Sequence, residues 1–303
     1  MGWNNPPVPW AEFERRLSGR PKNADRGDSP AGPERPRAEN WSRKRAPYQP
    51  PPAARRRVTT PYAELHCHTN FSFLDGASPP EELVEEAARL SLTALAVTDH
   101  DGMYGVVRFA EAAAALGVPT VFGAELTLDL PRRSQAGAAD PAGRHLVVLA
   151  RDPVGYARLC RAISTAHIAG GEKGLPKIGL AELATIGAAC GVPPNPNEPV
   201  TLSGVISRKV SPVRGGVGGA GHWQVLTGCR KGTVPAALVE HGPAVAAREL
   251  DLLVGAFGHD NVAVEIWDHG DPLDSARNDA LVALALRAGT EVVATNNVHD
   301  GAP

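Results

Sequence analysis

From Tyr62 onward, short apolar runs rich in β-branched residues alternate with longer stretches of helical periodicity. The runs expected to form strands are residues 62–68, 92–99, 118–125, 144–150, 261–266 and 290–296, with a shorter one before Cys229. The stretches expected to form helices are residues 79–90, 105–116, 154–167, 243–257 and 275–288. Near-continuous apolar strands separated by helices are typical of a parallel sheet covered on both faces. The pattern runs for about 245 residues, the size of a (β/α) barrel, and a doubly wound sheet is the alternative.

Residues 1–60 form a basic, Pro/Arg-rich tail of different composition. Residues 1–57 hold 13 Lys and Arg against 6 Asp and Glu and 11 of the 28 prolines, whereas the rest of the chain has a net charge of −9. Such a segment buries too little apolar surface to fold, so we expect disorder. It is either a solvated linker or an electrostatic contact for nucleic acid or a protein partner. Trp10, Phe13 and Leu17 share one helical face behind Pro9, which predicts a short docking helix near residues 9–18.

Residues 61–303 are expected to form one domain, interrupted by a Pro/Gly-rich loop or insertion near residues 187–222. No run approaches the roughly 18 apolar residues of a membrane span, and the N-terminus lacks the apolar core of a secretion signal. The four cysteines show no CxxC pairing, which indicates reduced thiols. Together these features predict a cytoplasmic protein without membrane contact.

Residue types that bind metals recur where the expected strands end. His66 and His68 lie two apart in an extended run, so both side chains point to one side while Cys67 points to the other. Asp75 follows in the next loop, whereas His145 fits less well because it precedes its apolar run. The ligand-type residues at the other strand ends are Asp99, His100, Glu125, Cys229, Asn297 and His299. A single histidine after a strand is more often an ordinary polar residue, but this repeated placement predicts a metal site.

The motifs AELHCHTNFSFLDGAS, LAVTDHDGMYG, FGAEL and ATNNVH resemble the PHP (polymerase and histidinol phosphatase) domain, and the resemblance covers nearly all of residues 62–299. It is closest to the version at the N-terminus of bacterial C-family DNA polymerases. The segments TDHDGMYGVVRFAEAA, LTGCRKG and TNNVH are similar to those of the error-prone, damage-inducible branch of these polymerases. The first residues, MGWNNPPVPWAEFERRLSGR, resemble the N-terminus of actinobacterial members. The resemblance implies a distorted seven-stranded (β/α) barrel with a cluster of up to three divalent metals, which would be zinc, manganese or iron.

The resemblance also implies which residues hold each metal. The first metal would be bound by His66, His68 and Glu125, the second by Glu125, His145 and Cys229, and the third by Asp75, His100 and His299. Active members carry Asp where this chain has Asn297, two residues before His299. An amide oxygen is neutral and a weaker ligand than a carboxylate, so the pattern predicts a poorly held first metal and weakened hydrolysis.

Two functions follow from the resemblance. In the first, the chain is the N-terminal PHP fragment of an error-prone DNA polymerase of damage-induced mutagenesis and translesion synthesis. Polymerase palm, fingers and thumb would then follow His299, and DNA, polymerase domains or mutasome subunits would be partners. The fragment itself would be a structural metal-binding module or a weak phosphoesterase of the 3′–5′ exonuclease type. In the second, it is a free-standing PHP phosphoesterase acting on small phosphate monoesters.

Overall fold

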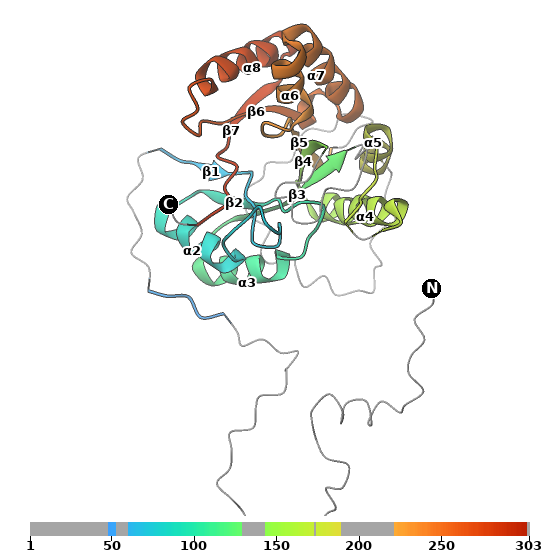
Figure 1. Ribbon diagram of the computed structural model, residues 1–303. Coiled ribbons are helices and arrows are strands. Elements are labelled where there is room, and N and C mark those ends of the chain that lie inside the picture. The colour runs from blue at the N-terminus through green and yellow to red at the C-terminus, as the bar shows by residue number, and fades with distance from the viewer. Residues whose placement is uncertain (1–47, 53–59, 129–142, 173, 189–220, 302–303) are drawn as a thin grey trace, which may run out of the picture. The chain divides into compact units, whose positions relative to one another are not determined.

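The computed structural model describes residues 48–52, 60–128, 143–172, 174–188 and 221–301. Within them the chain forms a seven-stranded sheet in which each strand pairs with the next along the sequence (Figure 1). The strands are β1 (Ala63–Glu64), β2 (Ala94–Val97), β3 (Thr120–Leu128), β4 (Arg144–Ala150), β5 (Trp223–Leu226), β6 (Val262–Ile266) and β7 (Glu291–Ala294). The predicted α/β class with seven strands is confirmed.

The prediction of a parallel sheet is wrong for one strand. β4 runs antiparallel to both β3 and β5, while all other neighbouring strands are parallel. A parallel neighbour needs a crossover connection, usually a helix, whereas an antiparallel neighbour can follow directly. No helical pattern separates the runs 118–125 and 144–150, which was the signal for the reversal. As a consequence, the amino end of β4 lies at the same edge of the sheet as the carboxyl ends of the parallel strands.

The sheet curls so that the segments that follow its first and last strands meet. Cys67 and Val298 form a parallel bridge, in which the His68 amide donates to the Val298 carbonyl at 2.7 Å and the Val298 amide donates to the His66 carbonyl at 2.9 Å. Regular strand pairing in β1 covers only Ala63–Glu64, less than the expected residues 62–68. The contact nevertheless holds residues 66–68 extended and places them beside the segment that follows β7.

The helices cover the sheet in two groups (Figure 1). They are α2 (Pro80–Leu90), α3 (Val106–Leu116), α4 (Pro153–Gly170), α5 (Leu180–Ala188), α6 (Thr233–His241), α7 (Pro243–Phe257) and α8 (Asp274–Ala288), with a 3₁₀ turn η1 (His259–Asn261). Proline opens α2, α4 and α7, where its missing N–H costs nothing. The α4 N-cap is Asp152, which accepts from the Gly155 amide at 2.8 Å. The sequence pattern did not predict α5 and α6, which have nine residues each.

The core consists of two apolar layers outside the sheet and a small one inside it. On one side, Val84 and Phe109 from α2 and α3 pack with Phe122 and with Cys67, whose side chain points away from His66 and His68 as predicted. The larger layer lies under α4, α5, α7 and α8 and includes Trp223. The inner layer holds Ala96, Val147, Leu149, Leu226 and Ala263, with Leu65, Val121 and Val293 partly buried against it. The inner layer is thus entirely apolar, and the polar side chains described below lie at the carboxyl edge of the parallel strands.

Some predictions fall on residues that the structure does not describe. The basic tail lies outside the described residues, apart from 48–52 and 60, and so does its expected helix near 9–18. Most of the loop expected at 187–222 also lies outside them, although residues 187–188 belong to α5 rather than to a loop. Among the helices described, none combines the length and apolar character needed to cross a membrane.

Candidate metal centre

The structure brings all nine predicted ligand residues to one edge of the curled sheet. His66 and His68 follow β1, His100 follows β2, and Glu125 lies within β3. His145 is near the amino end of β4 and reaches the same edge because that strand runs in reverse. The remaining members follow β1, β5 and β7; they are Asp75, Cys229, Asn297 and His299.

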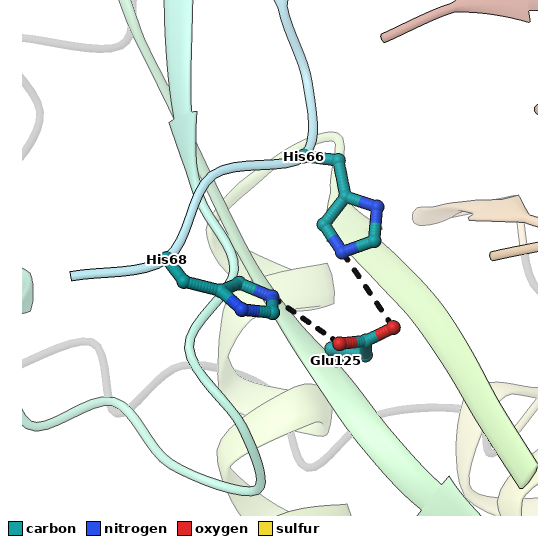
Figure 2. Close-up of side chains that lie close together, drawn as sticks. All are labelled: His66, His68 and Glu125. Carbon is teal, nitrogen blue, oxygen red and sulfur yellow. Dashed lines mark ion pairs between the residues drawn. The ribbon is translucent and has the colours of Figure 1, made fainter. Parts of the chain in front are cut away.

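Glu125 lies at the centre of the cluster and is 1% exposed. Its Oε2 is 3.2 Å from His68 Nε2 and 3.3 Å from His100 Nδ1. Its Oε1 is 3.5 Å from His66 Nε2 and 3.4 Å from His145 Nδ1. The Cys229 thiol lies 3.7 Å from the same oxygen. Figure 2 shows how His66 and His68 approach the two oxygens of this carboxylate from different directions.

Asp75 is a second carboxylate, held by the loop after β1. Its Oδ2 is 2.5 Å from His68 Nδ1 and 3.3 Å from His100 Nε2, and its Oδ1 is 3.2 Å from His299 Nδ1. His68 and His100 therefore reach both carboxylates, each with one ring nitrogen on Asp75 and the other on Glu125. The two carboxylates and the two imidazoles between them form one continuous ligand set.

The residues present fit divalent cations. His66 Nε2, His68 Nε2, His100 Nδ1, Glu125 Oε2 and Asn297 Oδ1 are buried and make no hydrogen bond within the described residues. A buried polar atom that makes no hydrogen bond costs about 1–3 kcal/mol. The three imidazole nitrogens face Glu125 at 3.2–3.5 Å without hydrogen bonding to it, so the five atoms need a further explanation. A bound cation supplies one, because imidazole nitrogens and carboxylate oxygens are the donors that zinc, manganese and iron accept.

The ligand atoms fall into three overlapping groups, each within 4.8 Å: His66, His68 and Glu125; His68, Asp75 and His100; and His100, Glu125 and His145. The first group coincides with the expected first metal site. In the second group, His68 takes the place that the resemblance implied for His299. In the third group, His100 takes the place that it implied for Cys229. The assignment of residues to individual metals therefore stays a prediction.

The electrostatics of the cluster favour positive charge. Burial opposes ionisation of Glu125, but His66 and His100 outweigh it and hold the pKa of that carboxyl well below its ordinary value. Burial also opposes ionisation of Asp75, and its contacts with His100 and His299 lower its pKa further than burial raises it. Burial lowers the pKa of His66, whereas the carboxylates of Glu265 and Glu125 raise it well above normal. Both central carboxylates stay ionised and attract cations.

Two carboxylates behind the ligands were not predicted to have their observed roles. Glu265 accepts from His66 Nδ1 at 2.7 Å, and its signal was a lone charge in the apolar run of β6. Asp99 was taken as ligand-type, but it accepts from the Thr69 amide at 2.7 Å and from the Ser72 hydroxyl at 2.8 Å. Asp99 thus holds the loop that carries Asp75 instead of facing the cluster.

The cluster opens into a cavity of about 180 Å³. Three residues that sequence reasoning missed line it beside the expected ligands: Arg230, Trp267 and His269. Arg230 is exposed, so its guanidinium faces the solvent that fills the cavity, whereas His269 Nε2 donates its hydrogen to the Asn296 carbonyl at 2.6 Å. A guanidinium beside a candidate metal centre is suited to an anionic substrate such as a phosphate.

The chain is similar in sequence to known proteins. Residues 64–196 match the PHP domain family. The chain carries a PHP domain. The error-prone DNA polymerase of Mycolicibacterium paratuberculosis is 50% identical over 304 residues, covering 100% of this chain and 24% of that protein. The error-prone DNA polymerase of Mycobacterium tuberculosis strain H37Rv is 48% identical over 303 residues, with the same two coverages.

This chain therefore spans about a quarter of the length of the relatives it matches. The error-prone DNA polymerase of Nocardia farcinica is 43% identical over an alignment that covers 100% of this chain and 27% of that protein. Among solved structures, an amidohydrolase from Chromobacterium violaceum has a TM-score of 0.45 at 18% identity, over 78% of this chain and 87% of that one.

Proposed function

We propose that this PHP domain binds divalent cations around Glu125 and Asp75 and serves as the metal-binding N-terminal domain of an error-prone DNA polymerase. The observation that carries the proposal is the buried Glu125 carboxylate, with four imidazole nitrogens within 3.5 Å of its two oxygens. Relatives that match the whole chain are named error-prone DNA polymerases. DNA, the polymerase domains and mutasome subunits are the proposed partners, in damage-induced mutagenesis and translesion synthesis.

The chemistry that suits such a site is phosphoester hydrolysis. A divalent cation supplies a Lewis acid for a phosphate oxygen and lowers the pKa of a bound water. The chain's own residues have simpler tasks. The imidazoles of His66, His68 and His145 would hold the cation through ring nitrogens, and Arg230 would donate hydrogen bonds to phosphate oxygens at the cavity wall. On DNA the outcome would be removal of a 3′-terminal nucleotide.

Asn297 makes this activity weak. Its Oδ1 is buried at the cavity and makes no hydrogen bond within the described residues, so it is available as a ligand without contributing charge. Of the other residues proposed for the first cation, only Glu125 is anionic, and its oxygens also face His100 and His145. We therefore propose partial occupancy of that position. Zinc, manganese and iron all suit the mixture of nitrogen, oxygen and sulfur donors.

The second candidate is hydrolysis of small phosphate monoesters. The observation that favours it is the size of the cavity, since about 180 Å³ admits a phosphate with a small substituent. A terminal nucleotide would have to extend out of the cavity toward solvent. The two candidates share the same metal cluster and differ in what lies beyond the phosphate.

The test compares the parent protein with Asn297→Asp. Metal content by mass spectrometry and hydrolysis of a generic phosphate ester and of a 3′-recessed DNA are measured side by side. We expect substoichiometric metal and low activity in the parent, and higher values of both in the variant, because an anionic oxygen replaces a neutral one of the same size. Asn297 has a φ of 45°, a conformation that Asp also tolerates, so the exchange leaves the backbone intact. A fully loaded parent as active as the variant would contradict the proposed role of Asn297.

A further inference from the structure

Glu265 is a fully buried carboxylate that the metal cluster does not include. It lies on β6 at 0% exposure, and its Oε1 is 2.7 Å from His66 Nδ1. The same oxygen accepts from the Thr295 hydroxyl at 2.5 Å, while Oε2 has no hydrogen-bond partner within the described residues. A buried carboxylate is expensive unless a positive group balances it. Its charge is therefore directed at one imidazole, that of His66.

The contact fixes how His66 faces the cluster. When Nδ1 donates its hydrogen to Glu265, Nε2 carries the lone pair, and Nε2 is the atom that lies 3.5 Å from Glu125. The backbone of His66 is held as well, since its amide donates to Glu64 at 2.9 Å and its carbonyl accepts from Val298 at 2.9 Å. The ring has no freedom to turn its other nitrogen toward the cluster.

The segment that carries Asn297 contacts both Glu265 and His66. Thr295, which donates to Glu265, is two residues before Asn297, and Val298, which pairs with His66, directly follows it. Asn297 brings an uncharged oxygen to the cavity, whereas Glu265 brings a full negative charge behind His66. A carboxylate behind a ligating histidine increases the basicity of the imidazole and so strengthens its bond to a cation.

We infer that Glu265 is a positioning residue for His66, and that its charge compensates in part for the uncharged Asn297. This inference rests on the proposed function, since it concerns cation binding at the same cluster. It predicts an energetic coupling between two residues that do not contact each other. Removing the Glu265 charge should be most harmful when position 297 is also uncharged.

The experiment is a double-mutant cycle of the parent, Glu265→Gln, Asn297→Asp and the double variant. Zn²⁺ and Mn²⁺ affinity is measured by competition with a chromophoric chelator. Gln keeps the size of the side chain and an oxygen that accepts from His66, but removes the charge. We expect Glu265→Gln to weaken binding by roughly 10- to 100-fold in the parent, as for other carboxylates behind metal ligands. In the Asn297→Asp background the same exchange should cost severalfold less.

Glu81→Gln is the matched control. Glu81 is also a buried carboxylate, 8% exposed, but it lies on α2 and pairs with Arg108, away from the cavity-lining residues. The Glu81→Gln substitution should leave the affinity of the protein for Zn²⁺ and Mn²⁺ unchanged. Melting curves recorded in chelator separate a loss of fold from a loss of binding.

Equal costs of Glu265→Gln in the two backgrounds, or no cost in either, would overturn the inference while leaving the metal site intact. A parent protein that binds neither cation would instead overturn the proposed function and this inference with it. If Glu265→Gln does not fold, NMR of ¹⁵N-histidine in the zinc-loaded parent decides the positioning role. We expect His66 to carry its hydrogen on Nδ1, and the opposite tautomer would overturn the inference.

Discussion

The two carboxylates of the metal centre are held in different ways. Glu125 lies within β3, which is paired on both sides, and the side chain is 1% exposed. Asp75 lies in the loop after β1, and its partner His299 has a side chain that is 36% exposed. One carboxylate is positioned by backbone pairing and the other by side chains such as Asp99 that hold a loop. A strand fixes a ligand more rigidly than a loop does, so the Glu125 region should bind first and the Asp75 region should adapt.

The largest effect should come from Glu125→Gln. This exchange removes the negative charge of the carboxylate that contacts His68 and His100, the two imidazoles that also contact Asp75. We expect the variant to lose nearly all bound metal, because four imidazole nitrogens would then surround an uncharged amide. Metal content after gel filtration measures the loss. If the variant kept half of its metal, Asp75 would be the stronger site and the comparison would be reversed.

His68→Ala should have the next largest effect, because this imidazole touches both carboxylates. A cation stabilises the folded state, since the unfolded chain lacks the assembled site; at a concentration 100 times its Kd the gain is about 2.7 kcal/mol. Chelation should therefore lower the Tm of the parent by several degrees and leave the Tm of His68→Ala almost unchanged. Identical melting curves of the parent with and without a strong chelator would show that the cluster binds no cation.

Asp99→Asn tests the loop-held region alone. The Asp99 carboxylate accepts from Thr69 and Ser72, and an amide replaces only part of this hydrogen bonding. We expect a loss of about 1–3 kcal/mol in the free energy of unfolding, together with weaker cation binding near Asp75 and unchanged binding near Glu125. Urea denaturation and a metal titration measure the two quantities. Equal weakening at both carboxylates would mean that they behave as one rigid unit.

The smallest effect is expected from Cys229→Ser, at the edge of the Glu125 region. The thiol lies 3.7 Å from Glu125 Oε1, and sulfur is a soft donor that favours zinc, whereas a hydroxyl favours harder cations. The variant should bind less zinc relative to manganese, with little change in Tm. Competition of the two cations for the parent and the variant measures the ratio. An unchanged ratio would place Cys229 outside the ligand set.

The α/β class and the placement of most candidate ligands could be predicted from the amino-acid sequence. Apolar runs of strand length separated by helical stretches predict the sheet, because both patterns are local. His66 and His68 face one side and Cys67 the other since side chains alternate along an extended chain. The clustering at one edge, where Glu125 meets both histidines, was predicted from the placement of most ligands at expected strand ends, although Glu125 lies within β3, which continues to Leu128.

The direction of β4, and with it the place of His145, was fixed by long-range pairing, although the lack of a helical pattern before residue 144 was a signal for it. Strand direction depends on pairing between residues far apart in sequence, so the local pattern of residues 144–150 is compatible with either direction. The roles of Glu265 and Asp99 were undetermined for the same reason. Both are single acids at the end of apolar runs, and whether such an acid meets a cation, an imidazole or a loop amide depends on which segment the fold brings opposite it.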